Sequence, residues 1–128
     1  MPELFLDSGA VTFLAEASDD ARAIMAVFGS EDLWPPTVPS PVLIECLTGH
    51  PHKDALTHRF LKGCDIATSL TVPKARRAAM LRTMAGRGSA VDAALVALAE
   101  PGGFILTGDK HDLGALAANA VEVSIGVI

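Results

Sequence analysis

Short apolar segments that alternate with helical segments constrain the fold of this chain more than any other feature. Apolar runs of strand length lie at residues 4–6, near Val38, and at residues 65–68, 104–107 and 121–125. Strands and helices that alternate in this way are typical of a parallel sheet covered by helices on both faces. We therefore predict one α/β domain over residues 1–128, with three layers (α/β/α) around a short, central, mainly parallel sheet.

The helices expected between these strands follow from apolar spacing and from capping residues. Within each segment the apolar residues repeat at helical spacing, and Ser, Asp or Pro residues stand at several of the starts. Ser8 is the expected N-cap of the first helix, and Ser40 is that of the third. The expected helices cover residues 9–16, 19–28, 41–47, 53–62, 73–87 and 89–99, and a last segment through Leu113 and Leu116.

The helix expected at residues 89–99 is apolar on every side after its first turn, which marks a helix buried inside the domain. Ser89 and Asp92 have the spacing of a capping box, in which each side chain bonds to the other's backbone N–H. Asp92 is the only charged residue of this element. An ionised carboxylate in such a place is costly unless it is paired. Taken alone, Asp92 is best explained as a capping acid stabilised by the helix dipole.

Three further acids occupy positions that would bring them close to Asp92. Asp7 follows the first strand, and Asp109 follows the strand at residues 104–107 after one glycine. Glu45 is the only charge in a second helix that we expect to be buried. Ligands of open parallel sheets bind beyond the carboxyl ends of the strands, where helix N-termini also point. We therefore expect Asp7, Glu45, Asp92 and Asp109 to meet at one edge of the sheet.

Carboxylates gathered in this way indicate a site for divalent cations. Like charges raise one another's pKa unless cations are present, and Mg²⁺ and Mn²⁺ prefer oxygen ligands. Two such ions can activate a water and stabilise the leaving oxygen in phosphodiester cleavage. Asp112, shortly after Asp109, either joins the group or caps the last helix. No Ser-His-Asp order, phosphate-binding glycine loop or reactive cysteine motif in the sequence indicates a competing chemistry.

Four segments resemble the motifs of PIN-domain proteins and follow in that family's order: residues 4–11, 38–45, 89–97 and 106–113. The short length and the first and third segments are most similar to VapC toxins of toxin–antitoxin pairs. The resemblance implies a PIN-like fold and an Mg²⁺- or Mn²⁺-dependent ribonuclease that cleaves single-stranded regions of RNA. It implies that Asp7 and Asp92 are the principal metal ligands. Glu45 and Asp109 match the two other acids, which support the metal or position water.

The same resemblance implies roles for neighbouring residues and for partners. Ser8 and Thr107 match small hydroxyl residues beside the site, and Asp112 matches an acid whose role varies between relatives. Gly108 is a departure, because many relatives carry a polar or basic residue there that touches substrate. A VapC-like protein would form a homodimer and would be silenced by a small antitoxin that occupies the acidic groove.

Each acid also has a simpler explanation, and other functions stay open. Asp7 suits the cap of a turn, Asp109 suits the cap of the last helix, and Glu45 suits a helix more exposed than expected. A receiver-like domain phosphorylated on an Asp would also gather acids, although no strand in the middle of this chain ends in Asp. The remaining alternatives are a PIN nuclease of RNA processing outside toxin–antitoxin pairs and a degenerate PIN scaffold that only binds partners.

Charge and composition argue against several other classes. The formal net charge of −5 disfavours broad non-specific binding to nucleic-acid backbones. The basic residues at 73–87, Arg87 among them, scatter around the axis of their expected helix, which favours a solvated helix over an RNA-binding face. No apolar run approaches the ~20 residues of a membrane span, and the acidic N-terminal segment does not resemble a signal peptide. We therefore predict a cytoplasmic protein without a membrane partner.

Overall fold

The computed structural model describes residues 2–128 and contains a five-stranded sheet in which all neighbouring strands run parallel. The strand order is β3-β2-β1-β4-β5, so the first strand of the chain lies at the centre of the sheet. The predicted short, central, parallel sheet is therefore confirmed. Its strands are β1 Leu4–Leu6, β2 Thr37–Pro39, β3 Asp65–Ala67, β4 Phe104–Thr107 and β5 Ser124–Val127.

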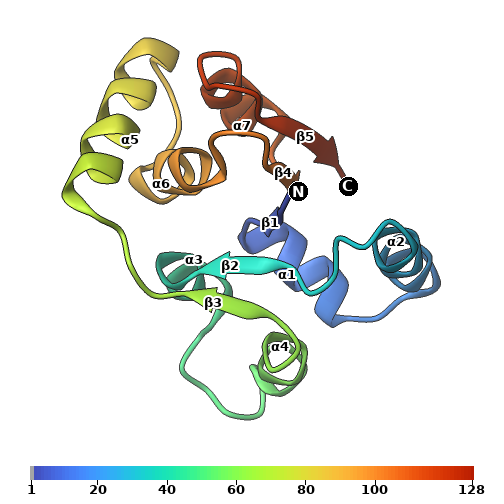
Figure 1. Ribbon diagram of the computed structural model, residues 1–128. Helices are drawn as coiled ribbons and strands as arrows, with labels where there is room; N and C mark the ends of the chain where they lie inside the picture. The colour runs from blue at the N-terminus through green and yellow to red at the C-terminus, as the bar shows by residue number, and fades with distance from the viewer. Residues whose placement is uncertain (1) are drawn as a thin grey trace.

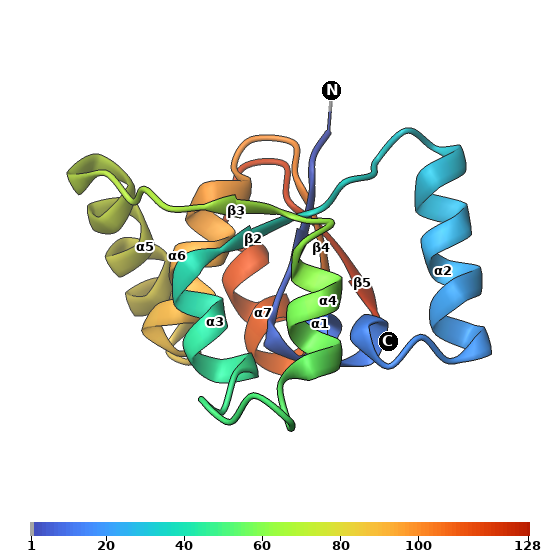
Figure 2. The ribbon, with the colours of Figure 1, turned by 90° about the horizontal axis from the view of Figure 1, so that it is seen from below.

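The helices of residues 2–128 form a layer on each face of the sheet (Figure 1). One layer contains α1 Ser8–Ala15, α3 Ser40–Cys46 and α4 Ala55–Leu61, and α2 Asp19–Ser30 stands on the side of edge strand β5 (Figure 2). The other layer contains α5 Val72–Ala85, α6 Ala90–Ala99 and α7 Lys110–Ala117. The predicted three-layer α/β/α fold is thus confirmed. None of the helices in this part of the chain is long and apolar enough to cross a lipid bilayer.

Alternating side chains of β1 build the core on both faces of the sheet. Leu4 and Leu6 pack with the helices of the α1 layer, whereas Phe5 packs with α5, α6 and α7. All three are buried, because successive residues of a strand point to opposite faces and here each face is covered. Burying one such side chain contributes about 1.5–3 kcal/mol. The central strands, and the turns that follow them, are therefore held firmly from both sides.

The direction in which successive strands are added to the sheet reverses between β1 and β4. These neighbours pair in register, with Leu4 opposite Phe104 and Leu6 opposite Leu106, so their carboxyl ends lie side by side. In open parallel sheets the crevice at such a reversal is the usual position for a ligand. The fold thus brings the acids that follow β1 and β4 to one place.

Two predicted boundaries are wrong for reasons of backbone conformation. The helix expected to reach residue 87 ends before Gly86, which adopts a left-handed conformation (φ 69°) and closes α5. The last strand, expected at residues 121–125, instead begins at Ser124. Glu122 has φ 54°, and its carbonyl accepts a hydrogen bond of 2.7 Å from the Gly102 N–H. The residues before β5 therefore turn against the loop that precedes β4.

The starts of two helices also differ from the prediction. Ser40, the expected N-cap, is the first helical residue of α3, and Pro39 takes the cap position without a side-chain hydrogen bond. The helix expected at residues 53–62 begins at Ala55, because residues 51–54 form a turn. Asp54 holds this turn: its carboxylate accepts hydrogen bonds from the Thr48 and Gly49 N–H groups at 2.8–3.1 Å.

Candidate metal centre

The turns after β1 and β4 place two acids at the carboxyl edge of the sheet. Asp7 lies between β1 and α1, and Asp109 is the N-cap of α7. The two turns touch through their glycines, because a Cβ atom on Gly9 would lie only 3.4 Å from the Gly108 Cα. A Cβ on Gly108 would lie 3.7 Å from the Gly9 Cα, an ordinary van der Waals distance. The two acidic turns therefore pack directly against each other at these glycines.

Asp7 is a buried N-cap whose carboxylate is oriented by donors on both oxygens. Oδ1 accepts a hydrogen bond of 2.8 Å from the Ala10 N–H, and Oδ2 accepts one from the Thr107 hydroxyl. The prediction that Ser8 caps α1 is wrong, because Ser8 is already helical and Asp7 takes the cap. Aspartate and serine are about equally good N-caps, so adjacent candidates could not be separated by residue type. With the residue only 5% exposed, its carboxylate is held in one orientation.

Thr107, the last residue of β4, connects the two acidic turns. Its hydroxyl donates to Asp7 Oδ2 and accepts a hydrogen bond of 2.7 Å from the Asp109 N–H. The direction of this chain is fixed, because an ionised carboxylate only accepts and a backbone N–H only donates. Thr107 has no exposed surface, so water cannot replace either bond. The hydroxyl therefore sets the position of Asp7 relative to Asp109.

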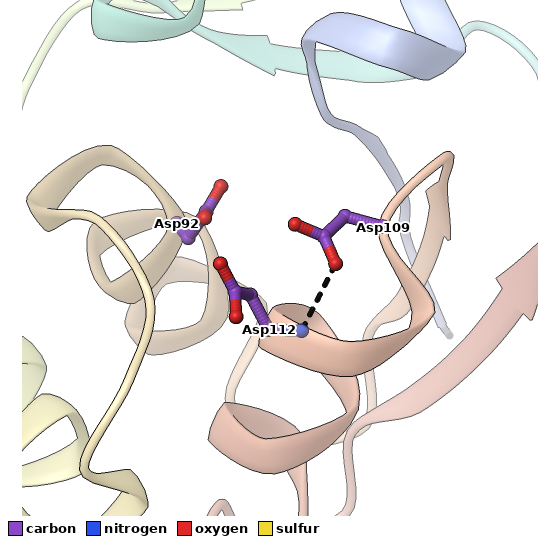
Figure 3. A group of neighbouring side chains, drawn as sticks. All are labelled: Asp92, Asp109 and Asp112. Carbon is purple, nitrogen blue, oxygen red and sulfur yellow. Dashed lines mark hydrogen bonds between the residues drawn. The ribbon is translucent and has the colours of Figure 1, made fainter.

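Asp92, Asp109 and Asp112 form a compact group, called here the acidic cluster. One carboxylate oxygen of each lies within 4.8 Å of those of the other two. Asp92 comes from the first turn of α6, Asp109 caps α7, and Asp112 lies in the first turn of α7. Figure 3 shows the three side chains directed toward one another across the space between α6 and α7. All three are half-buried.

Each carboxylate of the acidic cluster has one oxygen that accepts a hydrogen bond. Asp92 Oδ2 accepts from the Ser89 N–H at 3.4 Å, and Asp109 Oδ1 accepts from the Asp112 N–H at 3.0 Å. Asp112 Oδ1 accepts from Arg87 Nε at 2.7 Å. The second oxygen of each side chain accepts no hydrogen bond from residues 2–128. Each side chain is thus held on one side and keeps an oxygen for a ligand on the other.

The predicted capping box at the start of α6 is confirmed, and its acid is electrostatically strained. Ser89 Oγ accepts a hydrogen bond of 3.0 Å from the Asp92 N–H, and the Asp92 side chain accepts from the Ser89 N–H. The pKa of the Asp92 carboxyl is raised, first by burial and further by the charges of Asp7 and Asp109, although the Ser89 hydrogen bonds act to lower it. A cation beside Asp92 would remove this penalty.

Glu45 lies outside the acidic cluster, and the prediction that its helix is buried is wrong. Val42 is the only buried residue of α3, Ile44 is 80% exposed, and Glu45 is exposed. The pKa of the Glu45 carboxyl is nevertheless raised, first by partial loss of hydration and then by the charges of Asp92 and Asp7. Glu45 is therefore within electrostatic reach of these acids while facing solvent.

Arg87 is a member of the site that the sequence analysis missed. The predicted helix at residues 73–87 included Arg87, but α5 ends at Ala85. Arg87 therefore lies in the connection between α5 and α6, where it forms an ion pair of 2.7 Å with Asp112. Both neighbouring glycines have positive φ, 69° at Gly86 and 98° at Gly88. In the sequence, a glycine on each side of Arg87, directly before the capping box, indicates that the helix ends before the arginine. The arginine then lies in a turn and is free of the helix.

The donor set of the acidic cluster fits a hard divalent cation. It contains only carboxylate oxygens, the ligands that Mg²⁺ and Mn²⁺ prefer. Oxygens bound to one ion at ~2.1 Å lie at most ~4.2 Å apart, so oxygens within 4.8 Å of one another need only small side-chain movements. These three residues can therefore hold a metal ion, with Asp7 and Thr107 fixing the turn that carries one of them.

The predicted set of acids is thus only partly brought together. Asp92 and Asp109 lie in the acidic cluster, Asp7 reaches Asp109 through Thr107, and Glu45 acts from a distance. Asp112, for which two roles were open, joins the cluster, and Asp109 caps the last helix. No protein-family model matches the chain, and no curated protein is significantly similar to it.

Proposed function

We propose that this protein is a divalent-cation-dependent ribonuclease whose cation is held by the acidic cluster. One observation carries the proposal: Asp92, Asp109 and Asp112 converge at the carboxyl edge of the sheet, each with a carboxylate oxygen that accepts no protein hydrogen bond. Such an edge is the usual ligand position in this class of fold. Arg87 pairs with only one of these three carboxylates, and a divalent ion is the simplest way to stabilise the group as a whole.

The resemblance of four segments to PIN-domain ribonucleases supports RNA as the substrate and Mg²⁺ or Mn²⁺ as the ion. Those segments, residues 4–11, 38–45, 89–97 and 106–113, contain Asp7, Glu45, Asp92 and Asp109. In the fold these segments form β1 with α1, β2 with α3, most of α6, and the end of β4 with the start of α7. RNA is therefore the substrate class we assign, and single-stranded RNA is the form to test first.

The proposal gives each residue a distinct task. A bound divalent cation would activate water and stabilise the leaving oxygen of the phosphodiester. Asp92 and Asp109 would coordinate the cation, and Asp7 with Thr107 would keep the Asp109 turn in place. Glu45 would position the attacking water, because it faces solvent within electrostatic reach of these acids.

Cleavage of a labelled single-stranded RNA with Mg²⁺ or Mn²⁺ tests this proposal directly. Asp92→Asn and Asp109→Asn remove one charge each and keep a side-chain oxygen for the cap. Asp65→Asn is the matched control. Asp65 is exposed and is the first residue of β3, so it lies at the amino end of the parallel strands, whereas the acidic cluster lies at their carboxyl end. We expect each cluster variant to lose at least about a hundredfold in rate, more than loss of an outer-sphere partner, and the control to retain its rate. Metal-independent cleavage that both variants retain would contradict the proposal.

We further propose, from the VapC-like features of the sequence, that the ribonuclease is the toxin of a toxin–antitoxin pair. It would form a homodimer and be silenced by a small antitoxin with a basic side chain in the acidic groove. Expression alone should arrest growth, and co-expression of the neighbouring small gene should relieve the arrest. Metal-dependent cleavage by the purified protein without growth arrest would instead favour a nuclease of RNA processing.

A further inference from the structure

One cationic side chain contacts the acidic cluster. Among the ion pairs of residues 2–128, the pair between Arg87 Nε and Asp112 Oδ1, at 2.7 Å, is the one that involves this cluster. The other pair, Arg77 with Glu100, uses both Nε and Nη2 of its arginine and ties α5 to the end of α6. The pairing of Arg87 is different, because it leaves most of the guanidinium unused.

The free side of the Arg87 guanidinium is available to a ligand. Nε donates to Asp112, whereas Nη1 and Nη2 donate to no group within residues 2–128. The Arg87 side chain is 53% exposed, compared with 30% for its partner. An arginine held through Nε presents its two Nη atoms as a planar fork, which is suited to the oxygens of a phosphate.

The backbone that carries Arg87 is held in place on both sides. Arg82 Nε donates a hydrogen bond of 2.9 Å to the Gly88 carbonyl, which ties the connection back to α5. Gly88 packs so closely on α7 that a Cβ atom there would lie 2.7 Å from Leu116 Cδ1. The guanidinium is therefore positioned by the fold as well as by Asp112.

With one divalent ion bound, the acidic cluster would still carry an excess negative charge. An RNA phosphate that approaches Asp92, Asp109 and Asp112 meets three negative charges. One divalent ion together with Arg87 would neutralise them, whereas the ion alone would leave an excess negative charge that repels the substrate. An arginine beside the carboxylates thus solves a problem that the metal ion does not solve by itself.

We propose that Arg87 binds a phosphate of the RNA substrate beside the acidic cluster and that Asp112 is the residue that orients it. The inference rests on the proposed function in one respect, the assignment of RNA as the substrate. It adds a substrate-binding residue from outside the four segments that resemble PIN-domain motifs. In RNA binding, Asp112 acts through Arg87, which it holds by Oδ1. Its other oxygen stays free to contact the metal ion.

The test measures binding of a short, fluorescein-labelled single-stranded RNA by anisotropy across a series of salt concentrations, with Ca²⁺ replacing Mg²⁺. The variants are Arg87→Ala, Arg87→Lys and Asp112→Asn. Arg76→Ala is the matched control, because Arg76 is exposed on α5 and its side chain makes no hydrogen bond or ion pair within residues 2–128. Circular dichroism confirms that each variant is folded, and calorimetry with Mn²⁺ measures the metal affinity separately.

We expect Arg87→Ala to weaken RNA binding about tenfold to a hundredfold, the usual effect of one charged hydrogen-bonded contact. Loss of one phosphate contact should also lower the slope of log affinity against log salt by about 0.7, a change that a purely structural role would not cause. Arg87→Lys should keep that slope and recover part of the affinity. Asp112→Asn should weaken RNA binding in the wild-type background and have little further effect beside Arg87→Ala.

Equal RNA affinity and equal salt slope in Arg87→Ala and the wild type would overturn the inference, and so would a wild type that does not bind RNA. Failure of the proposed function has a different signature. In that case the wild type would bind RNA without cleaving it in Mg²⁺ or Mn²⁺. The difference in salt slope between the wild type and Arg87→Ala would still show whether Arg87 contacts a phosphate.

Discussion

Replacement of Thr107 by valine tests whether a single hydroxyl holds the two acidic turns together. Valine keeps the shape and the branched Cβ of threonine, so the packing in this buried position is retained. The hydrogen bond to the Asp7 carboxylate and the bond from the Asp109 N–H are both lost. A bond to a charged group contributes about 1.5–3 kcal/mol and a neutral one about 0.5–1.5 kcal/mol. Together they predict a decrease of about 2–4.5 kcal/mol in the free energy of unfolding.

Urea denaturation at neutral pH, followed by circular dichroism, measures this difference. Thr57→Val is the matched control, because Thr57 is also buried and its hydroxyl makes no hydrogen bond within residues 2–128. The control loses no hydrogen bond, so it should lower the free energy of unfolding by less than the ~2 kcal/mol that is the least expected for Thr107→Val. If Thr107→Val is no more destabilising than Thr57→Val, the hydroxyl does not connect the turns. Thr107→Val should also weaken Mn²⁺ binding, since the Asp109 turn is then less well held.

The remaining predictions concern backbone packing and acid stability. Gly103→Ala should lower the free energy of unfolding by about 1–3 kcal/mol, because the added methyl would lie 2.5 Å from the Ala99 carbonyl oxygen. Gly114→Ala, in open space within α7, should raise it by about 0.5–1 kcal/mol, and urea titration of both variants checks the contrast. Hydrogen bonds from Arg77 lower the pKa of Glu100 below its ordinary value of 4.5, so the stabilisation from Glu100 is fully present above pH 4.5 and is lost as the pH falls through the folded-state pKa. The difference in free energy of unfolding between the wild type and Glu100→Gln should thus be constant above that pH and shrink below it, and a difference that stays constant on acidification would refute this prediction.

The architecture was predictable because the strand and helix patterns are strong where both faces are covered. The run at residues 104–107 forms β4 with the predicted bounds, since an apolar segment of that length between glycines fits a buried strand. The helix at residues 89–99 is buried as predicted, and its Ser89–Asp92 capping box is present. These features depend on local sequence together with one general fact, that parallel sheets are covered on both sides.

The wrong or missing predictions concern features that depend on the rest of the fold. The apolar residues of α3 indicated a buried helix, yet composition alone does not reveal which faces of a seven-residue helix are covered, and Glu45 is exposed. Asp112 and Arg87 are far apart in the sequence, and their ion pair exists only because α7 packs against the connection between α5 and α6. The acid-rich edge was therefore predictable, but the membership of the acidic cluster was not.

Calorimetric titration of Mn²⁺ is the most direct test of the central claim, that the acidic cluster holds a divalent cation. The account predicts saturable binding to the wild type, binding at least about tenfold weaker to Asp109→Asn, and unchanged binding to Asp65→Asn. At an Mn²⁺ concentration of about one hundred times the Kd, the metal should stabilise the wild type by about 2.7 kcal/mol. Absence of Mn²⁺ and Mg²⁺ binding to the wild type, or equal binding to Asp109→Asn, would contradict the account.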